Sequence, residues 1–445
     1  MDVDAALSGR LGDRGVRSLL LGEGRHALRE VLGSMLGPDR VLGPCRLVRA
    51  HLKPARKLTA CYDVTVHGGT GVTPVAVTWF RGGAVPGTDE LDATEEELRR
   101  LGVSTPFERL SATRPSWAML VLAAPLDPAF PWLGHLSDKR RAAEALVESG
   151  VLTSAPHALE VRPIRYRPGQ RHVLEYRRPG DASLFVKLYR PGAGGAVAEA
   201  VIALAGLLEA AAVPGVRAVR PVAALGDGDA LVYRRASGTP LSDPLRGGSP
   251  APGHVQHVGR LMRAIHSSAP RPGSTLPVRT LEGEARVVLR ACEAMAALRP
   301  DLGARAAAIV DMARERLEAL EQEPPTVVHG DMKADHMLWG PRGLTVLDTD
   351  RCGLADPAFD LGKMLADLRW WSAAAPRGDA AGVEAEMLAA YGVAGPRLAR
   401  AELYAALLLV RMAARRVPLA APDWASRTAR LLAVAARTVE VREAA

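Results

Sequence analysis

Apolar residues recur every three to four positions over long stretches of the chain, which is the period of an amphipathic helix. In the segment 255–266 the apolar residues Val255, Val258, Leu261, Met262 and Ile265 fall on one face. Similar patterns predict helices over 93–101, 196–211, 301–321, 360–371, 384–391, 401–416 and 426–441. A short β-rich insert, 326–350, interrupts the helical second half.

Strand-like runs dominate the first half, and they follow one order twice. The segments 51–62 and 165–176 each place Pro early, a basic residue three positions later and Tyr eight positions after the Pro. Each is followed by a second strand-like run, at 75–81 and 185–190, and then by a helix and a further strand. We interpret this as a duplicated β–turn–β–β–α–β unit. Chance similarity between two hairpins is the alternative.

Composition narrows the class of protein. The chain has 445 residues, of which 48% are hydrophobic and 24% charged, as in globular proteins of two to four domains. No apolar run approaches the roughly 20 residues of a membrane span, and the acidic start predicts a cytoplasmic protein without a signal peptide. The four Cys are scattered, and the net charge of +8 is dispersed. Neither a disulfide framework, a zinc site nor nucleic-acid binding is therefore indicated.

Lysine is rare in this chain, with six of the 57 basic residues, so each Lys position is informative.

The β-rich insert contains most of the candidate catalytic residues. One apolar strand ends in His329-Gly330-Asp331, His336 follows five residues later, and a second strand ends at Asp348. This predicts two acids and an imidazole at the ends of adjacent strands, facing one cleft. Phosphoryl transfer from a nucleotide needs such a set, because a carboxylate must orient the acceptor hydroxyl and further ligands must hold Mg²⁺.

These residues resemble the signature of the aminoglycoside-phosphotransferase group of protein-kinase-like small-molecule kinases. That signature continues with a Gly-x-x-Asp-Pro-x-x-Asp-Leu segment, which here is 353–361. The resemblance covers about residues 160–445. It implies an α+β, protein-kinase-like bilobal fold, with a small β-rich N-lobe and a mainly helical C-lobe, here preceded by a second N-lobe-like repeat.

The resemblance also implies roles for the motif residues. Asp331 is expected to be the catalytic base and Asp348 the chief Mg²⁺ ligand. His336 stands at the second metal position, where the family more commonly has Asn. Imidazole suits Mn²⁺ better than Mg²⁺, so His336 weakens the second site or favours Mn²⁺, unless it only holds the loop.

Other residues of the insert are expected to support the site. His329 is interpreted as an organiser of the loop, and Lys333 as either a phosphate-steadying cation or a solvated surface residue. Asp350 is included as a supporting residue. Asp356 and Asp360 are expected to cap the helix that follows Pro357 rather than to touch substrate.

The small lobe of this family needs a strand Lys that pairs with a helix Glu and with the phosphates. The resemblance implies that Lys187 is that residue and that Glu199 is its partner, with Glu209 as the alternative. The backbone near Arg234 and Ala236 is expected to meet the adenine, and the turn 167–170 to cover the phosphates.

The first repeat has Thr78 where the second has Lys187, so it is expected to lack nucleotide chemistry. A cap over the acceptor site, a dimer surface and a regulatory site stay open as its role. The predicted domains are a degenerate N-lobe-like domain at 1–150, the nucleotide-binding N-lobe at 151–236 and the helical C-lobe at 237–445.

The leading hypothesis is a phosphotransferase that moves the γ-phosphoryl group of ATP or GTP, with Mg²⁺ or Mn²⁺, to a hydroxyl of a small molecule. The alternative is a non-catalytic, kinase-like nucleotide-binding or regulatory protein. A protein kinase would carry His-Arg-Asp and Asp-Phe-Gly, which are absent here. No nucleic-acid or membrane partner is expected, and a homo-oligomer through the N-terminal repeat stays open. The identity of the acceptor and the choice of nucleotide are open too. So is the question of whether the enzyme serves antibiotic resistance or metabolism.

Overall fold

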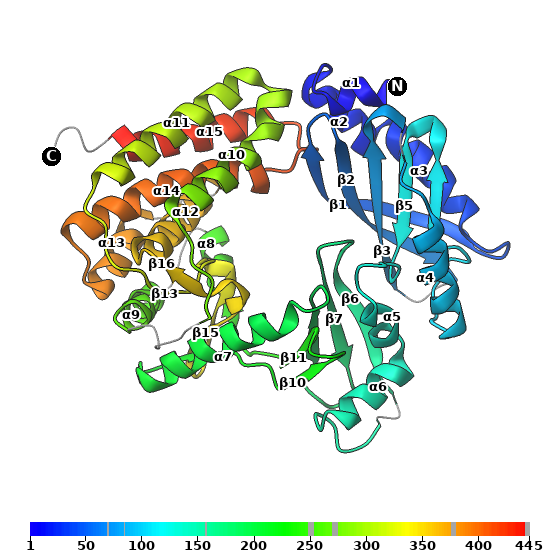
Figure 1. Ribbon diagram of the computed structural model, residues 1–445, viewed down its shortest axis with the longest axis horizontal. Helices are drawn as coiled ribbons and strands as arrows, with labels where there is room; N and C mark the ends of the chain where they lie inside the picture. Colours follow the sequence, from blue (N-terminus) through cyan, green and yellow to red (C-terminus); the bar gives the residue numbers. More distant parts are fainter. Residues whose placement is uncertain are drawn as a thin grey trace. The chain divides into compact units, whose positions relative to one another are not determined.

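The computed structural model describes residues 1–68, 71–83, 85–155, 158–247, 253–268, 275–374 and 380–440. The Pro/Gly-rich stretch 270–273 and most of the stretch 247–253 lie outside these residues. The fold is mixed α+β, as predicted (Figure 1). Two compact units divide the chain: unit 1 holds 1–196, 221–235 and 418–422, and unit 2 holds 197–220, 236–417 and 423–445.

Unit 1 begins with a five-stranded antiparallel sheet of order β1-β2-β3-β5-β4. Its strands are β1 (Val41–Lys53), β2 (Lys57–His67), β3 (Val72–Phe80), β4 (Ser111–Arg114) and β5 (Met119–Ala123). Three helices that the sequence patterns did not predict pack against this sheet (Figure 1): α1 (Val3–Leu7), α2 (Gly12–Leu21) and α3 (Glu23–Ser34). Leu19, Leu20 and Leu28 on these helices are fully buried.

The second sheet of unit 1 has the order β10-β11-β8-β7-β6. Its strands are β6 (Glu160–Arg167), β7 (Arg171–Arg177), β8 (Leu184–Leu188), β10 (Ala223–Leu225) and β11 (Ala230–Arg234). If the strands of each sheet are numbered along the chain, both sheets have the same spatial order of strands: first, second, third, fifth and fourth. A helix separates the third and fourth strands in both cases, α4 (Asp89–Arg100) and α7 (Gly194–Ala210). This shared order agrees with the expected repeat, and a common origin of the two segments stays a prediction.

The two matched sequence segments fall on equivalent hairpins. The segment 51–62 runs from the end of β1 through the turn into β2, and 165–176 runs from the end of β6 into β7. Tyr62 and Tyr176, the matched tyrosines, are fully buried, and each hydroxyl donates to a backbone carbonyl, of Leu20 and Leu136 respectively. The shared Tyr is thus a core residue whose polar tip is satisfied.

The second sheet is covered by two short helices, α5 (Trp132–Ser137) and α6 (Lys139–Glu148). Leu133 and Leu146 from these helices join Tyr176, Val186 and Leu188 of the sheet in one buried cluster. Asp138 begins α6, because its carboxylate accepts the backbone N–H groups of Arg140 and Arg141.

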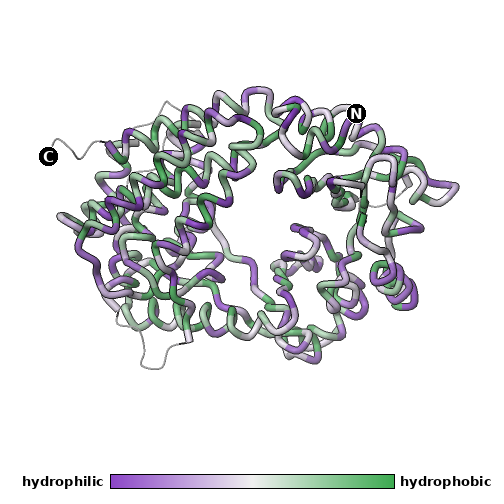
Figure 2. The backbone as a smooth tube through the Cα atoms, turned by 45° about the horizontal axis from the view of Figure 1, so that its top comes forward, coloured by the Kyte–Doolittle hydropathy of each residue, from purple (hydrophilic) through white to green (hydrophobic). Residues whose placement is uncertain are grey.

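Unit 2 is mainly helical and carries two small sheets, of order β12-β14-β15-β9 and β13-β16. Its helices after α7 are α8 (Ser242–Gly247), α9 (His254–His266), α10 (Leu281–Leu298), α11 (Pro300–Ala319), α12 (Ala358–Ala374), α13 (Ala380–Tyr391), α14 (Gly395–Arg416) and α15 (Trp424–Glu440). The predicted helices of this half match α9 and α11 to α15, and α10 was not predicted. Apolar and polar stretches alternate along these helices (Figure 2), as expected for elements with one buried face.

The small strands of unit 2 position the candidate site. They are β9 (Val216–Ala218), β12 (Thr239–Pro240), β13 (Thr326–Val328), β14 (Met337–Gly340), β15 (Gly343–Val346) and β16 (Gly353–Ala355). Across the described ranges of the chain, no helix is long and apolar enough to cross a membrane.

Candidate active site

The predicted catalytic loop begins where β13 ends. His329, Gly330 and Asp331 follow Val328 directly, and β15 ends two residues before Asp348. His329 is fully buried and uses both ring nitrogens within the loop. Its Nε2 donates to the carbonyl of Leu347 at 3.0 Å, and its Nδ1 accepts the N–H of Asp331 at 3.2 Å. These contacts tie the two strand ends together, as expected of a loop-organising histidine.

The structure brings three predicted residues together. The ligand atoms of Asp331, His336 and Asp348 all lie within 4.8 Å of one another. His336 Nε2 is 3.1 Å from Asp348 Oδ2. Asp348 has a left-handed backbone, with φ 55° and ψ 46°, a conformation that few non-glycine residues adopt and that often marks a functional position.

The tautomer of His336 fits a metal ligand. Its Nδ1 lies 3.0 Å from the backbone carbonyl of Asp331, which can only accept, so Nδ1 carries the proton. Burial lowers the pKa of His336, which leaves the ring neutral at pH 7. The Nε2 lone pair then faces the Asp348 carboxylate, and two acceptors at this distance call for a shared cation. The donor set therefore fits a divalent metal ion with mixed nitrogen and oxygen ligands.

Two lysines flank the carboxylate of Asp331. Lys363 Nζ lies 3.4 Å from Oδ1, and Lys333 Nζ lies 3.5 Å from Oδ2. Burial alone would raise the pKa of Asp331, but Lys363 and Lys333 outweigh it and hold that pKa well below its usual range. Asp331 is therefore ionised at neutral pH and can accept a hydrogen bond from a hydroxyl group.

The helix α12 supports the whole loop with three residues spaced i, i+3 and i+7, which lie on one helical face. Asp360 accepts the N–H groups of His329 at 2.6 Å and Gly330 at 2.9 Å. Lys363 meets Asp331, and Asp367 accepts the N–H of Ala334 at 2.8 Å. Asp360 and Asp367 are both fully buried.

One of the two helix-capping predictions is confirmed and the other is wrong. Asp356 accepts the N–H of Ala358 at 2.9 Å, as a cap of α12 should. Asp360 does not cap the helix, because its two oxygens are turned to the catalytic loop. The offsets alone could not separate these roles, since Asp and Pro at the start of a helix favour a cap at both positions.

The residues predicted to bind the nucleotide lie on or beside the strands and the helix that were predicted to carry them. Lys187 is on β8, with Nζ 5.2 Å from the centroid of the Tyr233 ring. Glu199 is on α7, where its Oε2 accepts the hydroxyl of Thr275 at 3.2 Å. Arg234 ends β11, and Ala236 follows it by two residues. Lys187 belongs to unit 1 and Glu199 to unit 2, so their pairing stays a prediction.

The first sheet has other chemistry at the equivalent positions. Thr78 on β3 shares a hydrogen bond of 3.1 Å with Thr59. Glu95 on α4 is buried and accepts both the N–H and the hydroxyl of Ser111 at 3.1 Å. Arg99 pairs with the second oxygen of Glu95 at the same distance. These contacts serve the packing of α4 on its sheet.

Three aromatic residues of the helical unit lie in the core or against arginines, which leaves little aromatic surface for stacking on a substrate. Tyr391 is buried, and its hydroxyl lies 2.9 Å from both His266 Nδ1 and Arg397 Nη1. Trp370 is buried beside Arg416, and Trp371 lies beside Arg246. Trp370 and Tyr391 are therefore core residues.

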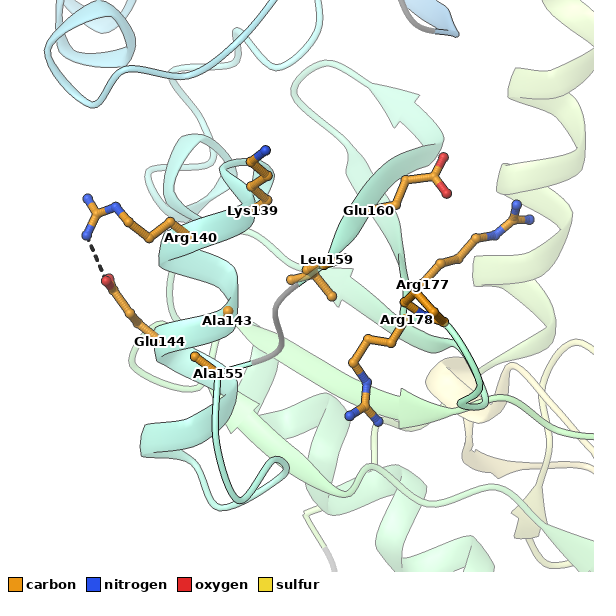
Figure 3. A pocket seen from close by; sticks show the side chains of 11 residues that line it. Lys139, Arg140, Ala143, Glu144, Ala155, Leu159, Glu160, Arg177 and Arg178 are labelled. Carbon is orange, nitrogen blue, oxygen red and sulfur yellow. Dashed lines mark hydrogen bonds and ion pairs between the residues drawn. The ribbon is translucent and has the colours of Figure 1, made fainter.

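A cavity of about 700 Å³ in unit 1 is separate from all of these residues. Its walls come from α6 and from the segments that precede β6 and follow β7, and they include Lys139, Arg140, Arg177 and Arg178 (Figure 3). The dashed pair in that view is Arg140 with Glu144, 2.7 Å apart. No predicted catalytic or metal residue lines it.

Sequence reasoning missed Lys363, although a signal was present. Lys363 is one of only six lysines, and it lies two residues after the Asp-Pro-x-x-Asp-Leu segment. Asp367 and Arg351 were missed too, because charges on an amphipathic helix or a turn are usually solvated.

Paired acids, a buried imidazole and flanking lysines on an α+β fold form a set that phosphoryl transfer can use. Comparisons with known proteins identify the family of the chain. The model of the phosphotransferase enzyme family (APH) matches residues 164–404, more than half of the chain, so the chain belongs to this family. Curated proteins give no match.

Solved structures of small-molecule kinases are similar to the chain. The GDP and kanamycin complex of APH(2")-IIia is 16% identical, with a TM-score of 0.49, and covers 66% of this chain and 98% of its own. A choline/ethanolamine kinase family protein from Mesorhizobium loti is 19% identical, with a TM-score of 0.45, over 68% and 95%. Spectinomycin phosphotransferase APH(9)-Ia is 13% identical, with a TM-score of 0.46, over 68% and 96%.

Proposed function

We propose that this phosphotransferase moves the γ-phosphoryl group of ATP or GTP to a hydroxyl group of a small molecule, with Asp331 as the residue that orients the attacking hydroxyl. The observation that supports it most directly is the convergence of Asp331, His336 and Asp348 at the strand ends of a family member. A divalent ion on His336 and Asp348 would neutralise the charge of the phosphates.

Asp331 is suited to orient a hydroxyl rather than to keep its proton. Its pKa is held low by Lys363 and Lys333, so it is a weak base in the ground state. Phosphoryl transfer passes through a loose transition state in which the nucleophile needs little early deprotonation, so positioning supplies most of the catalysis. Lys333 and Lys363 also bring positive charge to the side of the loop where the transferred group develops its charge.

The nucleotide is expected to be held by Lys187, Glu199 and the backbone near Arg234 and Ala236. Lys187 stands on a strand whose neighbours Val186 and Leu188 are fully buried, which fixes the backbone that carries it. The non-catalytic alternative predicts nucleotide binding without transfer, and the same experiment separates the two.

The test is transfer from ATP and from GTP, with Mg²⁺ or Mn²⁺, into a pooled library of hydroxylated antibiotics and metabolites, followed by mass spectrometry. Asp331→Asn should lower transfer by about 10²–10⁴-fold while calorimetry shows largely retained nucleotide affinity. Asp335→Asn is the matched control, since Asp335 is an exposed acid of the same loop. Full activity of Asp331→Asn would remove the assigned role, and a protein that binds Mg·nucleotide but yields no product with any acceptor would favour the regulatory alternative.

A further inference from the structure

Three arginines of unit 2 gather around one carboxylate beside the catalytic loop. Arg279 Nη1 lies 3.1 Å from Glu284 Oε1, and Arg411 Nη1 lies 3.5 Å from Glu284 Oε2. Arg279 Nη2 also donates to the carbonyl of Arg351 at 2.9 Å. We call Arg279, Arg351 and Arg411 the arginine cluster. Its members come from three segments far apart in the sequence: the residue before the cap of α10, the turn after Asp348, and α14.

The arginine cluster adjoins the residue that carries the proposed chemistry. Gly330 precedes Asp331 and has φ +76°. A Cβ placed on Gly330 would lie 2.1 Å from the carbonyl oxygen of Arg351 and 3.2 Å from Nε of Arg279. The guanidinium of Arg279 is thus packed against the backbone one residue before Asp331, and only glycine permits this approach.

The positive charge of the arginine cluster exceeds the negative charge of the carboxylate that pairs with it. Within the described residues, Glu284 is the carboxylate that pairs with Arg279 and Arg411, so two guanidinium groups share its one negative charge, and both of them repel Arg351. The buried Nε of Arg279 has no hydrogen-bond partner in the same part of the chain. Burial, together with the repulsion of Arg279 and Arg411, lowers the pKa of Arg351. A guanidinium resists losing its proton, so this strain is relieved when an anion binds.

Asp331 attracts Arg351 as well, but its charge is shared with two lysines. Its two oxygens already face Lys363 and Lys333. The neighbouring acids are engaged too, since Asp360 holds backbone N–H groups and Asp367 pairs with Arg416 at 2.6 Å. Although protein surrounds part of its charged group, Arg351 is solvent-exposed as a residue, so a ligand can approach it.

We propose that the arginine cluster binds an anionic group of the acceptor, a carboxylate or a phosphate, so that the enzyme phosphorylates a hydroxylated acid rather than a polycation. This inference rests on the proposed function of the site. Guanidinium groups bind carboxylate and phosphate through paired N–H donors, which would fix the acceptor hydroxyl relative to Asp331. A polycationic acceptor would meet a surface of its own sign.

The first experiment compares acceptors by charge. Phosphoryl transfer from ATP is measured into three pools of hydroxylated compounds: sugar acids and sugar phosphates, neutral sugars and nucleosides, and cations such as kanamycin and choline. Products are expected from the anionic pool. Products from the cationic or neutral pools alone would overturn the proposal and leave the proposed function intact.

Variants then assign the binding to the cluster. Arg411→Gln should raise KM for the anionic acceptor at least tenfold with a smaller change in kcat, and Arg411→Lys should restore part of this loss. Arg290→Gln, on the exposed face of α10, is the matched control and should keep the wild-type KM. An equal KM for Arg411→Gln and the control would refute the role of the cluster, provided that both variants keep the wild-type thermal midpoint.

A binding measurement decides the case in which no pool yields a product. Sulfate, citrate and pyrophosphate are titrated calorimetrically into the full chain saturated with Mg·AMP-PNP, so that these anions cannot occupy the nucleotide site. Binding that weakens at least tenfold in Arg411→Gln supports the anionic subsite. Absence of binding for all three anions, or binding equal in Arg411→Gln, overturns it. Failure of the proposed function would show separately, as a wild-type protein that yields no product with any acceptor, whether or not it binds Mg·nucleotide.

Discussion

The substitution Asp360→Asn tests whether α12 fixes the catalytic loop. Asp360 is fully buried, and its two carboxylate oxygens accept the N–H groups of His329 and Gly330 at 2.6 and 2.9 Å. His266 Nε2 lies 3.5 Å from one of these oxygens. Asn has the same shape but only one accepting oxygen, so its NH₂ group must face one of the two N–H donors.

The cost follows from these contacts. A hydrogen bond to a charged group contributes about 1.5–3 kcal/mol, and a buried donor left without a partner costs about 1–3 kcal/mol. One lost bond and one orphaned N–H therefore predict a destabilisation of about 3–5 kcal/mol. For a unit of this size, each kcal/mol of destabilisation lowers the thermal midpoint by about 2–4 °C. The midpoint of Asp360→Asn should therefore be lower by at least about 6 °C.

Calorimetric unfolding of the full chain measures this shift, with Asp335→Asn as the exposed control. Burial opposes ionisation of Asp360, but its hydrogen bonds with His266 and with the backbone of His329 lower the pKa of its carboxyl overall. An acid with a lowered pKa contributes stability above its unfolded pKa of about 3.9, and this contribution is lost as the pH falls. The difference between wild type and Asp360→Asn should therefore shrink below about pH 4. A midpoint equal to that of the control at pH 7 would refute the reasoning.

Two further predictions concern the charged groups at Asp331 and the metal donors. Lys363→Met should lower kcat at least tenfold, because Asp331 loses the cation at 3.4 Å. Burial lowers the pKa of Lys363 to about 8, so wild-type transfer should fall as the pH rises through 8, and Lys363→Arg, which keeps its charge, should lack this fall. A fall shared by both proteins would assign it to another group. His336→Asn should shift the ratio of Mn²⁺ to Mg²⁺ affinity toward Mg²⁺ by about tenfold, since an amide oxygen replaces imidazole; an unchanged ratio in metal titrations would exclude His336 as a ligand.

Much of the fold was predictable because periodicity is a local signal. The buried hydrophobic residues of α9 are the ones that the apolar spacing selected: Val255, Val258, Leu261, Met262 and Ile265. The matched Pro, basic residue and Tyr placed both hairpins correctly. The three helices that precede β1 were not predicted, although α3 carries Ala27, Leu28, Val31 and Leu32 at helical spacing.

The site was predictable only in part, since its central residues lie within one motif but their supports do not. Asp331, His336 and Asp348 fall within 18 positions, at the ends of successive strands. Lys363 is a further 15 positions along the chain, on a helix. Helical periodicity shows which side of α12 is apolar but not which loop a polar residue on that side meets. The loop that such a residue contacts depends on the tertiary structure, which also determines the role of Asp360.

The spacing of Asp360, Lys363 and Asp367 explains how such a loop keeps its geometry. A loop that carries a catalytic carboxylate has few backbone hydrogen bonds of its own, and here the N–H groups of His329, Gly330 and Ala334 are all accepted by carboxylates from one face of α12. The same face supplies the ammonium that keeps Asp331 ionised. One rigid helix therefore sets both the position and the charge of the proposed catalytic residue, and it does so within unit 2 alone. Loss of Asp360 or Asp367 should then impair positioning, whereas loss of Lys363 should impair charge, and the two defects are separable because only the first lowers the thermal midpoint of the unit strongly.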